Sequence, residues 1–373
     1  MTKRSEYIFL IICSALVATL GAILVFSPVK SFSEKENRAL SGAPSLRLHT
    51  FFDGEFLDEL SDFCTDQFPF REYLTDLKAK CEIGLGKREN NGVFITESAL
   101  VDLHESEDYV ALEPNLAALR SLANSVGKEK LTLLCAPRSS DVNAALLPYD
   151  ASFSKDALYS RISAAGIDSP DVLTPLAALQ ASSGRAWYAT DHHWTTRGAY
   201  VAYRTLMESL DMSAYDLDFF DVDSASHSFL GTTYSKSGIT DYMPDSIYLY
   251  RYEGDEDFEI EYVYEGKVER GFYDFDKLDT KDKYAVFLGG NFAHIRIRQG
   301  ENDKPRLLLI KDSFANSAIP FLALHFDIDV IDPRYISAPL GETVNTDEYD
   351  KILILCGADT LATDMGFGKW IGK

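Results

Sequence analysis

Residues 306–335 read RLLLIKDSFANSAIPFLALHFDIDVIDPRY, and this stretch decides the fold class. The run LLLI is apolar without alternation, as in a strand that a parallel sheet buries on both faces. A tight turn follows at KDS, then a helix-like segment over 314–326 and a second apolar run, DIDVI. A strand, a helix and a strand in succession predict neighbouring parallel strands with a helix packed on the sheet.

The same order appears elsewhere in the chain. KLTLLCAP (130–137) and YDKILILCG (349–357) predict two more buried strands, and NLAALRSLANSVG (115–127) is an amphipathic helix that ends at a glycine. We therefore expect an α/β fold, a three-layer sandwich with a parallel sheet and helices on both faces. Residues 211–285 are rich in Tyr, Phe and Asp with strand-like alternation, which predicts a β-rich insertion.

The N-terminus has a different character. Residues 7–26, YIFLIICSALVATLGAILVF, contain no charge and are long enough to span about 30 Å of hydrocarbon. Lys3 and Arg4 precede this run, so the N-terminus is expected in the cytoplasm and the remainder outside. A cleaved signal peptide is the alternative, but its apolar core is normally shorter and a small-residue cleavage site should follow. We expect an uncleaved, single-pass anchor in the cell membrane.

The composition limits the remaining possibilities. A formal charge of −22 argues against nucleic acid as a partner, since phosphate binding requires basic patches. No CxxC spacing is present, and whether Cys64 pairs with Cys81 stays open. The expected organisation has four parts. A cytoplasmic tip and transmembrane signal anchor (1–28) are followed by a linker (29–50), a helical and hairpin subdomain (51–110) and a main domain that carries the insertion (111–373).

Ser313 is the first candidate for chemistry. It follows a buried strand directly and precedes a helix-like segment, so its hydroxyl is expected at the carboxyl edge of the sheet, where ligands bind in such folds. The backbone N–H groups of the turn, that of Phe314 in particular, and the helix dipole would stabilise an oxyanion there. The alternative is that Ser313 is only a helix N-cap, a common position for serine.

A serine nucleophile needs a base, and YATDHHWTTRGAYVAYR (188–204) offers one. Asp191 and His193 are two residues apart at the entrance to a predicted helix, so the carboxylate can orient the imidazole while the other ring nitrogen accepts the serine proton. His192 is expected to point to the opposite side and to have a supporting role, and Trp194 is expected to pack beneath His193. Asp and two His also suit zinc, but a catalytic site usually needs three convergent ligands, and the remaining histidines are scattered without ligand spacing, so we expect no metal.

These motifs resemble a known family. DHHW followed by GAYVAY, then KDSFANS and IDPRY, together with ENRALSGAP, DQFPFR and NNGVFI nearer the N-terminus, are similar to the DHHW family. That family is related to the SGNH-hydrolase-like domains of the alginate O-acetyltransferase proteins AlgX and AlgJ. The resemblance implies a three-layer α/β sandwich whose motifs are permuted relative to ordinary SGNH hydrolases. It places the acid, base and nucleophile on Asp191, His193 and Ser313.

Two departures from the family pattern concern the oxyanion site. Lys311 stands where those hydrolases usually have Gly before Asp312 and Ser313, and their Asn-containing block is not in its ordinary place. Asn291 in GGN (289–291) is a substitute. The oxyanion and substrate candidates are therefore Asn291, Arg334, Tyr335 and the backbone of Phe314, with Asp312, His192 and Trp194 in support.

The expected function is an extracytoplasmic serine-dependent O-acetyltransferase or acetylesterase that acts on a cell-surface polysaccharide through an acyl-enzyme. No cofactor is expected, and the resemblance implies a membrane-bound O-acyltransferase as acetyl donor. The alternative is a catalytically inactive glycan-binding or scaffold protein of a surface-polysaccharide assembly. A metallo-hydrolase is the third reading, and it would not need Ser313.

Overall fold

The computed structural model describes residues 3–33, 38–45, 53–103, 109–148, 152–182, 184–300 and 303–372. The chain forms two compact units. The first comprises residues 1–91 and 235–242, and the second comprises residues 92–234 and 243–373. The linker expected at 29–50 lies partly outside the described residues, and the domain boundaries proposed from the sequence stay a prediction.

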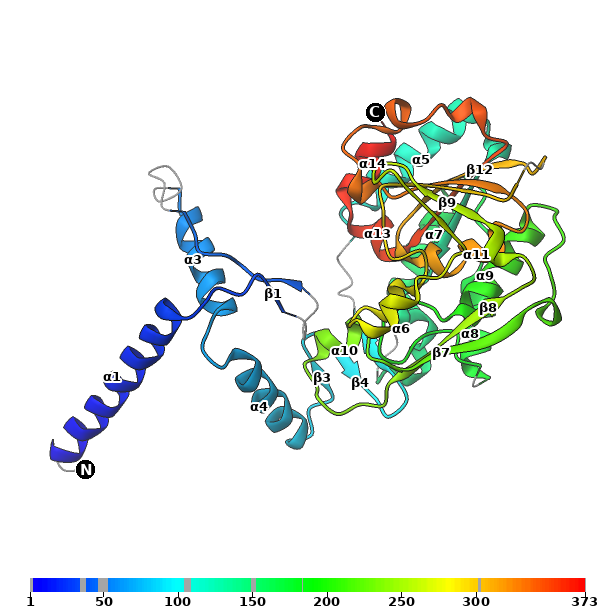
Figure 1. Ribbon diagram of the computed structural model, residues 1–373. Helices are drawn as coiled ribbons and strands as arrows, with labels where there is room; N and C mark the ends of the chain where they lie inside the picture. The colour runs from blue at the N-terminus through cyan, green and yellow to red at the C-terminus, as the bar shows by residue number, and fades with distance from the viewer. Residues whose placement is uncertain are drawn as a thin grey trace. The chain divides into compact units, whose positions relative to one another are not determined.

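The first unit contains the apolar N-terminal helix. Helix α1 (Lys3–Phe26), blue in Figure 1, is long and apolar enough to cross a bilayer, and none of its apolar window is buried by protein. The apolar helix expected here is confirmed. Cys64 and Cys81 carry free thiols. The other elements are β1 (Phe32–Ser33), β2 (Arg38–Ala39), α3 (Glu55–Asp66), α4 (Arg71–Gly84) and β3 (Glu89–Asn90).

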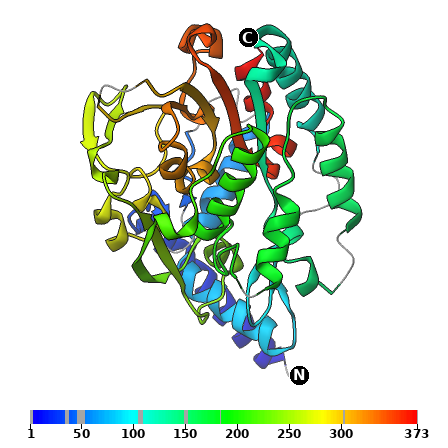
Figure 2. The same ribbon diagram turned by 90° about the vertical axis from the view of Figure 1, so that its right-hand side faces the viewer.

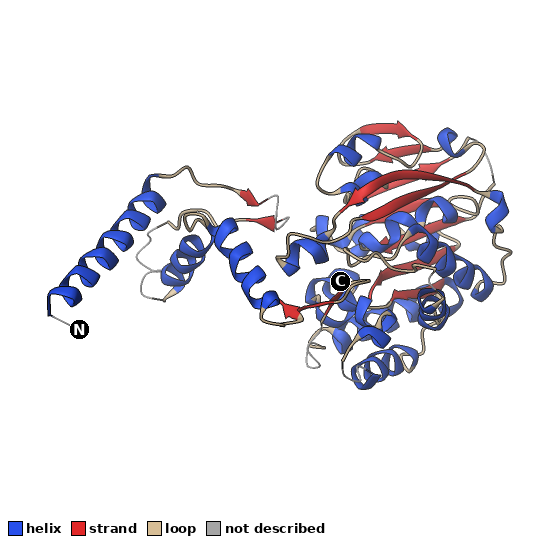
Figure 3. Cartoon of the chain, turned by 90° about the horizontal axis from the view of Figure 1, so that it is seen from below, coloured by secondary structure: helices blue, strands red, loops and turns tan. Residues whose placement is uncertain are grey.

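The second unit is built on a seven-stranded sheet of order β10-β9-β11-β13-β12-β14-β6 (strands in red, Figure 3). The four strands from β13 to β6 are parallel, as their continuous apolar runs predicted. Strands β11, β9 and β10 extend the sheet in antiparallel order, so the sheet is mixed and not fully parallel. The seven strands are β6 (Leu131–Ala136), β9 (Glu259–Tyr262), β10 (Lys267–Arg270), β11 (His294–Arg298), β12 (Arg306–Lys311), β13 (Asp327–Ile331) and β14 (Lys351–Gly357).

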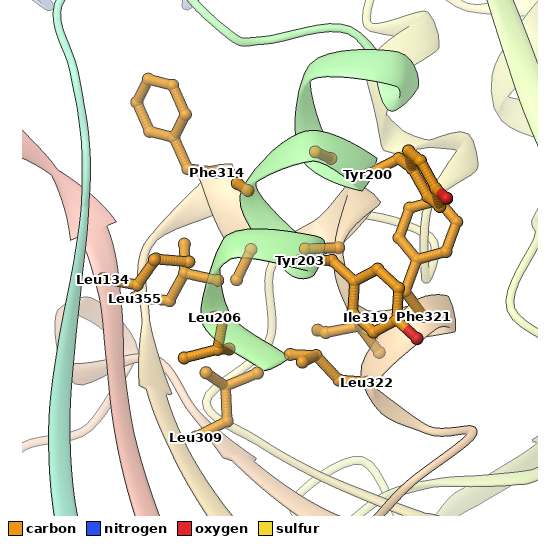
Figure 4. Packing of buried hydrophobic residues seen from close by; sticks show 14 of the residues in the cluster. Leu134, Tyr200, Tyr203, Leu206, Leu309, Phe314, Ile319, Phe321, Leu322 and Leu355 are labelled. Atoms are coloured by element: carbon orange, nitrogen blue, oxygen red, sulfur yellow. The ribbon is translucent and has the colours of Figure 1, made fainter. Parts of the chain in front are cut away.

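Helices cover both faces of this sheet, which gives the expected three layers. Buried side chains of α5, α7, α13 and α14 pack on one face, and those of α8, α9 and α11 pack on the other. Figure 2 shows α5 beside the red C-terminal helices. Figure 4 shows Leu206 of α9 toward Leu309 of β12 and Leu355 of β14, and Tyr203 of α9 beside Ile319 and Phe321 of α11. These helices are α5 (Leu112–Val126), α7 (Ser152–Ser163), α8 (Leu173–Ala181), α9 (Thr196–Ser209), α11 (Ile319–Leu322), α13 (Ala358–Thr363) and α14 (Met365–Ile371).

The strand-rich region at 211–285 divides into two parts. Strands β7 (Asp221–Phe229) and β8 (Asp245–Arg251) pair as an antiparallel hairpin, whereas β9 and β10 continue the main sheet. Strands β4 (Val93–Ile95) and β5 (Leu100–Asp102) form a further hairpin. Short helices complete the chain: α6 (Ser139–Val142), α10 (Thr232–Ser237), α12 (Leu340–Thr343), η1 (Lys128–Lys130), η2 (Ala144–Leu146), η3 (Leu217–Phe219), η4 (Asp255–Asp257), η5 (Phe275–Asp279), η6 (Lys283–Val286), η7 (Ser313–Ser317), η8 (Pro333–Tyr335) and η9 (Thr346–Glu348).

The helix expected after Ser313 is much shorter than the sequence pattern suggested. A 3₁₀ turn, η7 (Ser313–Ser317), comes first, and only the four residues of α11 follow. Pro320 lies in the first turn of α11, where its missing N–H costs no hydrogen bond; in the interior of one long helix it would remove a bond and clash. The helix-dipole contribution expected at Ser313 is correspondingly small.

Candidate active site

Ser313 lies at the carboxyl end of β12, as expected, but it is not the cap of the turn that follows. Asp312 is the N-cap: its Oδ1 accepts from the N–H of Phe314 at 3.0 Å. Its Oδ2 accepts from the N–H of Gly357 at 2.7 Å and from the hydroxyl of Thr360 at 2.6 Å. Because the preceding aspartate does the capping, the hydroxyl of the half-buried Ser313 is left for another partner.

That partner is His193. The Oγ of Ser313 lies 2.8 Å from Nε2 of His193, and Nδ1 of the same ring lies 2.5 Å from Oδ1 of Asp191. An ionised carboxylate only accepts hydrogen bonds, so the ring proton belongs on Nδ1, and Nε2 accepts from the serine hydroxyl. Three side chains separated by up to 122 positions thus form one hydrogen-bonded chain within the second unit.

The electrostatics suit a neutral imidazole beside a charged carboxylate. Burial, with the neighbouring His192, lowers the pKa of His193 to about 4, although Asp191 opposes this shift. Burial alone would raise the pKa of Asp191, but the two histidines and the hydrogen bonds to its oxygens hold that pKa well below its ordinary value. His193 is therefore ready to accept a proton at neutral pH.

Two rings hold His193 between them. Tyr284 is stacked on it with centroids 4.0 Å apart and an interplanar angle of 9°, and the ring of His192 lies 3.8 Å away. The expectation that His192 points to the opposite side is wrong. Residues 189–193 form bends and not an extended strand, so consecutive side chains do not alternate there.

Trp194 and Tyr284 join the histidine segment to the serine turn. The indole N–H of Trp194 donates to the carbonyl of Phe314 at 2.9 Å and to the hydroxyl of Ser317 at 3.1 Å. The hydroxyl of Tyr284 is within hydrogen-bond distance of the carbonyl of Ser313 and of the same Ser317 hydroxyl. Burial raises the pKa of Tyr284 well above its ordinary value, so this hydroxyl stays protonated. Trp194 thus packs under the site, and its hydrogen bonds connect the histidine segment to the serine turn.

Asp191 is positioned from the strand-rich region. Its Oδ2 accepts from the N–H of Thr232 at 2.7 Å and from the hydroxyl of Thr232 at 2.9 Å. The backbone of Gly231 lies so close that a Cβ there would overlap the Asp191 carboxylate. The buried Asp245 of β8 accepts from the N–H groups of Ala189 and Thr190 at 3.0 and 2.7 Å, which fixes the turn before Asp191.

A buried polar cluster contains the other candidates. Nζ of Lys311 donates to Oδ1 of Asn291 at 2.7 Å and to Oδ1 of Asn316 at 2.9 Å, and it pairs with Asp332 at 3.2 Å. Arg334 makes two hydrogen bonds to Asp332, at 2.8 and 2.6 Å. Burial lowers the pKa of Lys311, and the Asp332 carboxylate opposes that shift. The Tyr335 ring is exposed and lies 5.6 Å from the guanidinium of Arg334.

The oxyanion donors differ from the expectation. The N–H of Phe314 is engaged by Asp312, so it does not point free into the site. Among the described residues, neither the N–H of Ser313 nor Nδ2 of Asn291 donates to a protein acceptor. Asn316 and Ser313 are three residues apart in a 3₁₀ turn, where such side chains share a face, and Asn316 donates to Asn291 at 3.1 Å. Asn291 thus lies on the serine side of the turn.

Asp191, His192 and His193 also have the geometry of a metal cluster, since one ligand atom from each lies within 4.8 Å of the others. Those atoms already have protein partners. Both nitrogens of His193 are hydrogen-bonded, and Nδ1 of His192 lies 2.5 Å from the hydroxyl of Thr232. An ion would have to displace these contacts.

Thr232, Asp245 and Tyr284 support the site without any motif that marks them, whereas Ser317 is the last residue of KDSFANS. Thr232 stands in GTTYS and Asp245 opens an ordinary strand pattern, so nothing local distinguishes them from packing residues. Tyr284 lies in a short 3₁₀ helix that carries no periodic signal.

Comparison with known proteins defines the class. Residues 180–331 match the DHHW protein family, and residues 93–219 match the SGNH hydrolase-like domain of the acetyltransferase AlgX. The two matches together cover the Asp191–His193 segment, the serine turn and most of the sheet. The resemblance inferred from the motifs is confirmed.

Particular relatives agree with this class. The chain is 25% identical over 230 residues to the probable alginate O-acetylase AlgJ of Pseudomonas syringae pv. tomato, and the match covers 57% of this chain and 54% of AlgJ. The chain thus spans about half the length of the curated relative that it matches.

Two solved structures share the fold. A DHHW family protein from Eubacterium siraeum has a TM-score of 0.63 at 19% identity and covers 75% of this chain and 95% of its own. PatB1 of Bacillus cereus, solved with a sulfonyl adduct, has a TM-score of 0.61 at 17% identity and covers 74% and 98%. The predicted SGNH-hydrolase-like α/β architecture is therefore confirmed, with the mixed sheet as its correction.

Proposed function

We propose that this chain is an extracytoplasmic O-acetyltransferase that acetylates hydroxyl groups of a polysaccharide through an acetyl-serine intermediate. The observation that carries the proposal is the single imidazole of His193, hydrogen-bonded on one side to Asp191 and on the other to Ser313. The matches to AlgX and AlgJ support an acetyl group as cargo and a polysaccharide as acceptor.

In the first half-reaction Ser313 attacks the carbonyl carbon of an acetyl donor. His193 takes the hydroxyl proton on Nε2 as the bond between Oγ and the acetyl carbon forms. It passes that proton to the leaving group as the bond between the acetyl carbon and the donor breaks. Asp191 keeps the ring in the required tautomer and stabilises its transient positive charge. Tyr284 and His192 on the two ring faces restrict rotation of the imidazole.

The second half-reaction reverses these roles. A sugar hydroxyl gives its proton to Nε2 of His193 and attacks the acetyl carbon. The bond to Ser313 Oγ then breaks, and that oxygen recovers the proton from the imidazole. Attack by water in place of the sugar gives the esterase variant of the same reaction.

The oxyanion of both steps is assigned to the N–H of Ser313 and Nδ2 of Asn291. Lys311 and Asn316 both donate to the carbonyl oxygen of Asn291, so the orientation of this amide is fixed. Donors held in place before the reaction need no reorganisation when charge develops. Lys311, which departs from the family's glycine, thus has a positioning role.

The N-terminal helix supports the proposed location. We propose that α1 anchors the chain as a single pass with Lys3 and Arg4 on the cytoplasmic side, so that the catalytic residues act outside the cytoplasm. A membrane-bound O-acyltransferase is the proposed acetyl donor, because acetyl groups outside the cytoplasm must be delivered across the bilayer.

The test is mass spectrometry of the full chain in detergent after exposure to p-nitrophenyl acetate. We expect one acetyl group on Ser313, and Ser313→Ala is expected to lose turnover of this ester by about 10³-fold or more. Ser125→Ala is the matched control, since Ser125 is an exposed residue of α5 that bonds only to its own helix. Turnover that survives in Ser313→Ala would overturn the proposal.

The same experiment separates the alternatives. An inactive glycan-binding scaffold leaves Ser313 unmodified. A metallo-hydrolase built on Asp191, His192 and His193 loses turnover with a chelator and keeps it in Ser313→Ala. The proposed acetyl-serine route is insensitive to chelator.

A further inference from the structure

His192 has no part in the proton transfers described above, yet its position is closely defined. Its Nδ1 lies 2.5 Å from Oγ1 of Thr232, and that hydroxyl donates to Oδ2 of Asp191 at 2.9 Å. A threonine hydroxyl has one proton, which is used for Asp191. The Nδ1 of His192 therefore carries the ring proton and donates it, which leaves Nε2 as a hydrogen-bond acceptor.

The accepting edge of His192 faces away from Asp191. Nδ1 of His193 and Nδ1 of His192 both face this carboxylate, at 2.5 and 3.8 Å, so each Nε2 lies on the part of its ring turned away from it. Nε2 of His193 meets Ser313. Within the part of the chain that the structure describes, nothing bonds to Nε2 of His192, and its side chain is 39% exposed.

We propose that Nε2 of His192 binds a second hydroxyl of the acceptor sugar, next to the hydroxyl that His193 deprotonates. This inference rests on the proposed acetyl transfer. The two imidazoles are 3.8 Å apart, a separation that hydroxyls on adjacent sugar carbons can bridge. The acceptor class is therefore a sugar unit with a free vicinal diol, acetylated at one of its two hydroxyls.

The same contact distinguishes a vicinal diol from an acceptor with a single hydroxyl. A diol donates to both rings at once, with one oxygen attacking the acetyl carbon, whereas an alcohol with a single hydroxyl makes one of these bonds only. One additional hydrogen bond is typically worth about 1 kcal/mol, or roughly fivefold in the partition between two acceptors. The covalent step is unchanged: the proton goes to His193 Nε2, and the bond to Ser313 Oγ breaks.

The residue between Asp191 and His193 is a histidine whose tautomer Thr232 defines. The buried ring of Phe314 packs edge-on against His192 with centroids 5.9 Å apart, which helps to hold the imidazole in place.

The experiment uses the full chain, p-nitrophenyl acetate as donor, and two matched acceptors, cis-cyclohexane-1,2-diol and cyclohexanol. The readout is the ratio of acetylated alcohol to free acetate, which does not depend on how fast acetyl-Ser313 forms. We expect the wild type to favour the diol over the monoalcohol by about fivefold. His192→Phe removes the acceptor nitrogen and should reduce this preference to about twofold or less, while His192→Gln, whose carbonyl oxygen also accepts, should restore part of it.

His227→Phe is the matched control, because His227 bonds only to Ser224 and Ser246 of the β7–β8 hairpin. If circular dichroism shows that His192→Phe does not fold, His192→Leu replaces it, and the diol preference of His192→Gln is then compared with that of His192→Leu. A diol preference that persists in the Phe or Leu variant, or that is absent from the wild type, overturns the inference while acetylated Ser313 still supports the proposed function. Absence of acetylated Ser313 in the wild type overturns the proposed function itself.

Discussion

The serine side and the histidine side of the site are held by different kinds of structure. Ser313 follows a central parallel strand, and its turn is capped by Asp312, which is bonded to the adjacent strand end at Gly357. Asp191 and His193 lie in an irregular segment, which is fixed by side chains and backbone about 40–55 residues later in the chain, at Gly231, Thr232 and Asp245.

This difference predicts how substitutions on each side of the site affect activity and stability. The serine side shares the hydrogen bonds of the sheet core, so disturbing it also lowers the stability of the fold. The histidine side depends on a few long-range contacts, so disturbing it should remove activity with a smaller loss of stability.

Among substitutions outside the three proposed catalytic residues, the largest effect is expected from Gly231→Ala. A Cβ at this position overlaps the Asp191 carboxylate, so Asp191 must move and His193 loses its orientation. We expect turnover of p-nitrophenyl acetate to fall about 100-fold or more, since a misplacement of about 1 Å has this consequence. Gly84→Ala is the control, because nothing lies within 4 Å of a Cβ there. Equal rates in the two variants would show that the histidine side tolerates displacement.

On the serine side, Lys311→Met should reduce turnover by about tenfold and lower stability together. The substitution removes one of the two donors that orient the Asn291 amide, and it removes one of the two cations paired with the buried Asp332. Loss of a partner from a buried ion pair costs up to about 3–5 kcal/mol, reduced here because Arg334 remains. Chemical denaturation measures the change in the free energy of unfolding, and Lys128→Met, at an exposed position, is the control. Lost activity at unchanged stability would contradict the proposed difference between the sides.

Asp245→Asn is expected to have a smaller effect, about fivefold in turnover. In the wild type each carboxylate oxygen of Asp245 accepts from one N–H group, that of Ala189 or that of Thr190. The asparagine amide keeps one acceptor oxygen, but it loses the negative charge and the second acceptor. Hydrogen exchange should increase at residues 189–193 and stay unchanged at β12. An increase of similar size at β12 would mean that the two sides are not held independently.

The smallest effect is a pH dependence that is almost absent above pH 5. The base must be neutral, and the pKa of His193 is lowered to about 4, so activity should fall only as pH decreases through that value. At pH 5 roughly nine-tenths of His193 is unprotonated, compared with a few per cent at the ordinary value of about 6.5. If kcat/KM instead falls to half of its maximum near pH 6.5, His193 is not desolvated in solution.

Much of the fold follows from local sequence. The runs LLLI, ILILC and LTLLC predicted the central parallel strands because a strand covered on both faces needs no polar alternation. The sequence did not indicate that the antiparallel strands β9, β10 and β11 join this sheet. EIEY and HIRIR alternate between polar and apolar residues, as any half-exposed strand does. The long helix expected after Ser313 was wrong because Pro320 restarts the helix.

The hydrogen-bonded arrangement of Asp191, His193 and Ser313 was predictable, because motifs mark these three residues. The site was not predictable where a backbone group or a distant side chain decides. The cap by Asp312 engages the N–H of Phe314, and the bends before His193 bring His192 alongside it. These outcomes depend on local dihedral angles that residue identity does not specify.

The sequence by itself determined the apolar N-terminal helix, the α/β class and the three residues proposed for the chemistry, because each depends on composition or on neighbours within one element. Only the tertiary structure decided that Gly231, Thr232 and Asp245 hold the carboxylate side, that Tyr284 and Trp194 join the two halves, and that Lys311 orients Asn291. Such contacts connect segments far apart in the chain, and their energy exists only once the sheet has brought those segments together.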